Sequence, residues 1–108
     1  MISRLDVARS VKKGFAEVND TRLYYEIVGR GHPIVLVHGF SVDNRVWDSQ
    51  FEVFAKRFKV MRYDVRGFGK SALPTIEGEY SHAKDLKALL SQLGIDQTYL
   101  IGLSMGGN

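Results

Sequence analysis

A chain of 108 residues with 44% hydrophobic and 25% charged residues has the composition of one small globular domain. Its net charge of +3 comes from scattered lysines and arginines, which argues against a nucleic-acid-binding surface. The absence of cysteine excludes a disulfide framework, a thiolate metal site and a cysteine nucleophile. No apolar run is long enough to span a membrane. Both observations are compatible with the cytoplasm, which is the location we expect.

Residues 1–14 are polar and basic, and we interpret them as an N-terminal extension to a domain that covers residues 15–108. Residues 15–18 alternate apolar and polar side chains, as a half-buried strand does, and residues 23–28 form a second strand-like run. The turn signal Asn19-Asp20 lies between the two runs. Together they predict a β-hairpin.

Residues 34–37 are continuously apolar and mostly β-branched, which is typical of a strand buried on both faces of a parallel sheet. A helix is predicted from about 45 to 58, with Asp43 or Asn44 as its cap, because apolar residues recur there at spacings of three and four. Residues 59–63 predict the next strand.

Residues 64–80 are predicted to be irregular. A second helix follows Ser81, which can cap it, and Gly94 can end it. Residues 98–101 predict the last strand. A hairpin followed by alternating strands and helices predicts an α/β domain whose mostly parallel sheet is covered by helices on both faces.

The run Gly102-Leu103-Ser104-Met105-Gly106 follows the last predicted strand and reads G-x-S-x-G, the nucleophile-elbow pattern. Such a tight turn from strand to helix exposes the serine hydroxyl, and glycine two residues before and after it avoids collisions. The backbone N–H of Met105 would then face a substrate oxygen on which negative charge develops. The pattern predicts that Ser104 is a nucleophile; the alternative is an ordinary glycine-rich turn.

A second turn, His38-Gly39-Phe40, follows the buried strand 34–37. Because the carboxyl ends of parallel strands meet at one edge of a sheet, we expect this turn and the elbow to open on the same edge. The N–H of Phe40 is then expected to join that of Met105 in an oxyanion hole. The alternative is that Gly39 merely lets the chain turn into the next helix.

A serine nucleophile needs a base, and the chain offers three histidines. His32 precedes its strand, at the wrong end of the sheet, and His82 begins a surface helix. His38 lies at the right edge, but as part of a turn it is expected to fix that loop. None of the three is therefore a good candidate for the base.

Residues 69–71, Gly-Lys-Ser, resemble the end of a phosphate-binding loop. That motif needs a glycine five residues before Gly69, where this chain has Asp64, whose carboxylate would repel a phosphate. Nucleotide binding is therefore a weak alternative. We expect instead that Asp64 and Arg66 hold this loop by charge and hydrogen bonds, while Gly67 and Gly69 allow tight turns.

Three motifs now occur in order on a β/α framework: residues 38–40, the run D-x-R-G-x-G-x-S at 64–71, and residues 102–107. Together they resemble the α/β-hydrolase superfamily over about residues 15–108. The runs at 47–50 and 62–64 add a likeness to the 3-oxoadipate enol-lactonase branch and related small esterases. Serine in the elbow argues against haloalkane dehalogenases and epoxide hydrolases, whose nucleophile there is aspartate.

The resemblance implies a serine hydrolase of small ester or lactone substrates that forms an acyl-enzyme on Ser104. It implies that Phe40 and Met105 supply the oxyanion hole. It implies no cofactor and no metal. We expect the protein to bind a small-molecule substrate and to bind neither nucleic acid nor a membrane.

In this family the triad acid and histidine follow the serine, and the sequence ends four residues after Ser104. We therefore expect the N-terminal part of a hydrolase, truncated just after the elbow, inactive by itself, with strand 98–101 unpaired on one side. The alternative is a non-catalytic remnant that acts as a binding or interaction module. The substrate and the oligomeric state stay open.

Overall fold

The computed structural model describes residues 11–39, 42–71 and 81–102. Its strands form one five-stranded sheet in the order β1-β2-β4-β3-β5. β1 pairs antiparallel with β2 and β2 with β4, whereas β3 lies parallel to both β4 and β5. The strands are β1 (Lys12–Val18), β2 (Thr21–Val28), β3 (Pro33–Val37), β4 (Lys59–Tyr63) and β5 (Tyr99–Gly102), and the helical segments are η1 (Asn44–Trp47), α2 (Asp48–Phe54) and α3 (His82–Gln92).

The predicted hairpin is confirmed. Asn19 and Asp20 have φ angles of 48° and 62°, and Val18 lies opposite Thr21, so the turn is a two-residue one that needs left-handed backbone at both positions. Asn and Asp tolerate that conformation better than other side chains. β1 begins three residues before the predicted strand, because Lys12–Gly14 also pair with β2; the predicted extension therefore overlaps the sheet.

The first predicted helix is wrong in its extent. Asp43 caps it, since its carboxylate accepts a hydrogen bond from the backbone N–H of Arg45 at 2.9 Å. The chain then makes the 3₁₀ turn η1, continues as α2 and leaves the helix after Phe54. Lys59 must lie beside Pro33 to start the parallel pairing of β4 with β3, so residues 55–58 turn instead of extending the helix.

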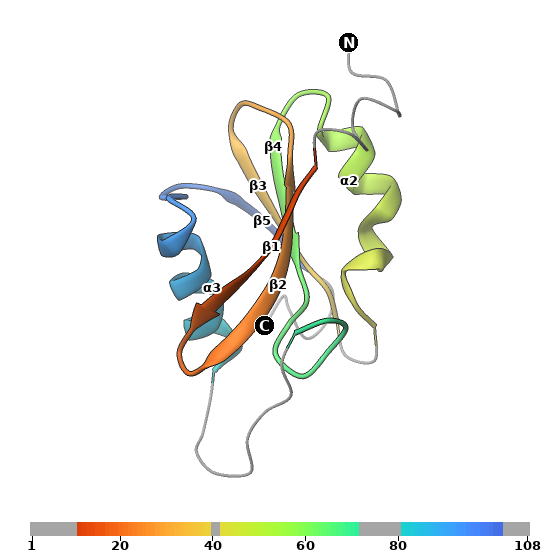
Figure 1. The fold of residues 1–108 in the computed structure, drawn as a ribbon. Helices are drawn as coiled ribbons and strands as arrows, with labels where there is room; N and C mark the ends of the chain where they lie inside the picture. The colour runs from red at the N-terminus through yellow and green to blue at the C-terminus, as the bar shows by residue number, and fades with distance from the viewer. Residues whose placement is uncertain (1–10, 40–41, 72–80, 103–108) are drawn as a thin grey trace.

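The two helices cover opposite faces of the sheet (Figure 1). Side chains of β3 alternate between these faces: Ile34 and Leu36 belong to a core cluster with Trp47 and Phe51 on the α2 side. Val35 and Val37 belong to the cluster on the α3 side, with Leu89 among its members. These four side chains are all buried, which confirms the prediction of a strand covered on both faces.

The second helix agrees with its predicted signals. The Ser81 hydroxyl accepts a hydrogen bond from the backbone N–H of Lys84, and Gly94 follows the helix with a φ of 74°. Neither this helix nor any other in the described part of the chain is long and apolar enough to cross a membrane.

β5 pairs with β3 and has no second neighbour among the described strands. Tyr99 and Leu100 are 57% and 54% exposed. This agrees with the expectation that the last strand has one open side.

Candidate active site

The three sequence motifs leave the sheet where the parallel strands β3, β4 and β5 end. We call this carboxyl-terminal end of the three strands the candidate edge. Val37, the last residue of β3, lies opposite Tyr63 in β4 and opposite Gly102 in β5. The turn that begins with His38, the loop that begins with Asp64 and the predicted elbow therefore start side by side, as expected from the parallel topology.

The predicted site residues themselves, Ser104, Met105 and Phe40, lie outside the described residues. Their roles stay predictions. The structure does describe the residues that precede them, Gly39 and Gly102, and the side chains that hold this edge together.

His38 is fully buried and uses both ring nitrogens. Its Nε2 accepts a hydrogen bond from the backbone N–H of Val65 at 2.8 Å, and its Nδ1 lies 2.7 Å from the carbonyl oxygen of Gly39. Because a backbone N–H can only donate, Nε2 carries no proton and Nδ1–H donates to Gly39. The Phe68 ring meets the imidazole edge-on at 5.6 Å. His38 therefore fixes its loop, as predicted, and is not free to act as a base.

The Asp64 carboxylate joins two loops. Its Oδ1 accepts hydrogen bonds from the backbone N–H and the side-chain amide of Asn44, at 2.8 and 2.7 Å, and its Oδ2 accepts one from the backbone N–H of Lys70 at 2.9 Å. The side chain is buried, and Gly67 and Gly69 both have positive φ angles. The predicted roles of Asp64 and the two glycines in shaping this loop are confirmed.

Arg66 also holds the loop, through a partner that the sequence reasoning missed. Its Nε and Nη2 donate to Oδ2 and Oδ1 of Asp85 at 2.9 and 2.8 Å. Asp85 belongs to α3, and no local spacing links it to Arg66. A signal was present nonetheless, since Asp85 lies four residues before Leu89 and so on the apolar face of the helix, where an unpaired carboxylate is costly.

The other two histidines, His32 and His82, belong to other parts of the fold. His32 precedes β3, at the opposite end of the strand, and its ring is 4.4 Å from the ring of Tyr99. His82 is the first residue of α3, and partial burial lowers its pKa. Within the described ranges, no group of three or more His, Asp or Glu side chains is placed to hold a metal ion.

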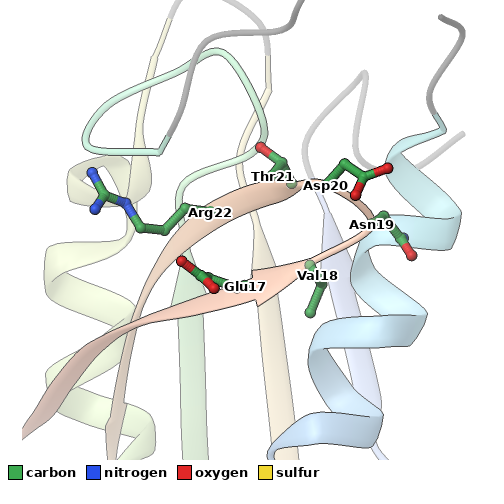
Figure 2. A pocket seen from close by; sticks show the side chains of 6 residues that line it. All are labelled: Glu17, Val18, Asn19, Asp20, Thr21 and Arg22. Atoms are coloured by element: carbon green, nitrogen blue, oxygen red, sulfur yellow. The ribbon is translucent and has the colours of Figure 1, made fainter.

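The surface is hollowed both beside the candidate edge and away from it. A cleft of about 780 Å³ lies between the segment after β3 and the loop after β4, and its lining includes Val42, Val46 and Phe68. A hollow of about 650 Å³ at the tip of the β1–β2 hairpin is lined by residues 17–22 alone. Figure 2 shows the side chains that line it. The first hollow is shaped by loops of the candidate edge, and so is a third one of about 450 Å³, whose lining includes Asn44, Asp64 and Lys70. The hollow at the hairpin tip is not.

Comparisons with known proteins agree with this arrangement. The family model described as alpha/beta hydrolase fold matches residues 32–108. The chain is 42% identical over 86 residues to a Synechocystis sp. protein named "Putative non-heme chloroperoxidase", covering 78% of this chain and 31% of that protein. It is 35% identical over 94 residues to the soluble epoxide hydrolase of Corynebacterium sp., covering 86% and 33%.

Among solved structures, the enol-lactonase from Burkholderia xenovorans superposes with a TM-score of 0.80 at 37% identity, covering 87% of this chain and 38% of that one. The chain thus spans about a third of the length of the relatives it matches. With the motifs, the strand order and the family model in agreement, the chain belongs to the α/β-hydrolase family.

Proposed function

We propose that the whole protein is a serine hydrolase of small ester or lactone substrates, with Ser104 as its nucleophile. The observation that carries the proposal is the position of the G-x-S-x-G run, which starts at the last residue of β5, directly beside the end of β3. This is the edge at which the other two motifs also leave the sheet.

In the proposed reaction the Ser104 oxygen adds to the substrate carbonyl while its proton passes to a base, and that base then protonates the alkoxide as its bond to the acyl carbon breaks. Water then hydrolyses the acyl-enzyme and regenerates the serine. The N–H groups of Phe40 and Met105 would stabilise the negative charge on the carbonyl oxygen. One such donor can be worth about 3–4 kcal/mol in the transition state. The Gly39 carbonyl belongs to the same planar peptide unit as the proposed Phe40 donor, so its bond to His38 supports a fixed donor there.

The substrate class rests on the resemblance to small lactonases and esterases, and the 37% identity to an enol-lactonase supports it. The epoxide hydrolase relatives favour it less, because this chain has serine where the resemblance implies aspartate for that reaction. Since His38 uses both ring nitrogens, we place the triad histidine and acid after Ser104 in the whole protein.

The test is Ser104→Ala in the protein expressed from its complete gene, assayed by hydrolysis of p-nitrophenyl acetate and by labelling with a fluorophosphonate. Loss of the nucleophile should lower kcat by at least about a thousandfold and abolish labelling. Ser91→Ala, a change of an exposed serine on α3, is the matched control and should leave both unchanged. Full ester hydrolysis by the Ser104→Ala variant would refute the nucleophile assignment.

The alternative of a non-catalytic binding module predicts a different result with the same reagent. In that case the unchanged protein, isolated from its source cells, should not react with the fluorophosphonate at all. Rapid labelling at Ser104, located by mass spectrometry of the labelled peptide, would exclude this alternative.

A further inference from the structure

Arg66 and Asp85 form a buried ion pair, with 7% and 2% of their surfaces exposed. Two hydrogen bonds, of 2.9 and 2.8 Å, join the guanidinium group to the two carboxylate oxygens. Such a two-bond contact fixes the plane of the guanidinium group as well as its position. The backbone that carries Arg66 is therefore held against α3.

The same pair is tied to the hairpin tip. Arg66 Nη2 donates to the carbonyl oxygen of Asn19 at 3.0 Å. The Asn19 amide in turn donates to Oδ1 of Asp85 and to the carbonyl oxygen of Lys84, both at 3.2 Å. Figure 2 shows the Asn19 side chain at the hairpin tip, on the side of α3. Three segments that are far apart in the sequence thus meet at one ion pair.

The ion pair also lies next in sequence to the hydrogen bonds that hold the His38–Gly39 turn. Val65, which precedes Arg66, donates its backbone N–H to Nε2 of His38, and His38 donates to the carbonyl oxygen of Gly39. Val65 and His38 are both buried. A chain of short contacts therefore runs from Asp85 through Arg66, Val65 and His38 to the Gly39 carbonyl.

We propose that the Arg66–Asp85 pair positions the His38–Gly39 turn. By holding the loop after β4, it keeps the Val65 N–H on the His38 ring, which fixes the ring in its Nδ1-protonated form and holds the Gly39 carbonyl. The effect on catalysis rests on the proposed function, in which this turn carries an oxyanion donor. Arg66 and Asp85 act through His38 and are positioning residues, not catalytic ones.

The first measurement is the ¹⁵N NMR spectrum of the histidine rings in the protein expressed from its complete gene. In the unchanged protein, His38 should show a protonated Nδ1 and an unprotonated Nε2. Asp85→Asn removes the charge that holds Arg66, so the His38 signals should change to those of a ring exchanging between its two neutral forms. This readout does not depend on enzymatic activity, and a merely stabilising ion pair would not alter it.

A second buried ion pair provides the matched control. Glu26 accepts hydrogen bonds from Nε and Nη2 of Arg62 at 3.0 and 2.8 Å, and its remaining described hydrogen bond is to Tyr24. Glu26→Gln should lower the melting temperature, as Asp85→Asn does. It should leave the His38 signals unchanged, because none of the described hydrogen bonds of Glu26 or Arg62 reaches His38, Gly39 or Val65.

The second measurement is the steady-state hydrolysis of p-nitrophenyl acetate. A displaced oxyanion donor weakens transition-state binding more than substrate binding, so Asp85→Asn should lower kcat about tenfold while KM stays within about twofold. Asn19→Gly is a milder variant, since glycine keeps the left-handed turn and removes only the two amide bonds. It should shift the His38 signals in the same direction and serves if Asp85→Asn does not fold.

The outcomes separate this proposal from the proposed function. Unchanged His38 signals in Asp85→Asn, or in Asn19→Gly if the first variant does not fold, would overturn the positioning role, whatever happens to the melting temperature. Changed signals with an unchanged kcat would overturn the link to catalysis. If the wild-type protein hydrolyses no ester but the His38 signals change in Asp85→Asn, the proposed function is refuted and the positioning role stands.

Discussion

Asp64 is a buried carboxylate whose three described hydrogen-bond donors, two from Asn44 and one from Lys70, are all neutral N–H groups. Hydrogen bonds to a charged acceptor are about twice as strong as those between neutral groups, so such a set can offset much of the cost of burial. The carboxylate can therefore act as a rigid connection between two loops at the candidate edge.

This packing makes a prediction for Gly69, which has a φ of 52°. A Cβ there would collide with Oδ2 of Asp64, whereas a Cβ at Gly94, with a φ of 74°, would meet no atom within 4 Å. Gly69→Ala should therefore lower the free energy of unfolding by about 3 kcal/mol or more, and Gly94→Ala by about 1 kcal/mol. Chemical denaturation measures both, and equal losses would contradict the contact with Asp64.

A further prediction at this scale concerns pH. Burial, with a smaller effect of the Asp85 carboxylate, raises the pKa of the Tyr63 phenol well above its ordinary value. Above about pH 10 the unfolded chain releases this proton while the folded chain keeps it, so the free energy of unfolding should fall by about 1.4 kcal/mol per pH unit from this group.

Tyr63→Phe removes that titration, and its stability should fall less steeply than that of the unchanged protein between about pH 10 and 12. Denaturation at a series of pH values measures the two slopes. Identical slopes would mean that the folded protein releases the Tyr63 proton as easily as the unfolded chain does.

At the scale of elements, local signals predicted structure well where the local conformation is the cause. Asn19-Asp20 predicted the hairpin because both residues tolerate left-handed backbone, and Ser81 predicted the start of α3 because its hydroxyl caps the helix. The first helix was predicted too long because its end is set by the pairing of Lys59 with Pro33, a contact between distant residues.

The candidate site divides in the same way. The loop-fixing role of His38 followed from its place in a turn directly after a buried strand, and the structure confirms it. The partner of Arg66 did not follow, because Asp85 reaches it only through the packing of α3 on the sheet. The nucleophile and the oxyanion donors still rest on the motifs and on family membership, because they lie outside the described residues.

At the scale of the whole molecule, the β5 edge of the sheet is open to pairing with other chains. Among the described strands β5 forms one edge, and Leu100 is 54% exposed there. An apolar, unpaired strand edge favours association with other chains. If the 108 residues are expressed alone, Leu100→Lys should weaken self-association about tenfold or more, as measured by sedimentation velocity.

The control for this prediction is Val53→Lys on α2. Val53 is 57% exposed, so it offers a similar apolar surface away from any strand edge. This change should leave self-association as it is. An equal effect of both variants would show that general hydrophobicity, and not the edge of β5, brings the chains together.

The strand order also has a consequence for synthesis. β3 is complete at Val37 and gains β4 at Tyr63, but its other neighbour, β5, ends at Gly102. A ribosome that adds about 5–20 residues per second needs about 2 to 8 seconds to extend the chain from Tyr63 to Gly102. During that time the nascent chain presents one side of β3, a strand of almost wholly buried side chains, without its final neighbour. We expect this interval to be when the growing protein depends most on a chaperone.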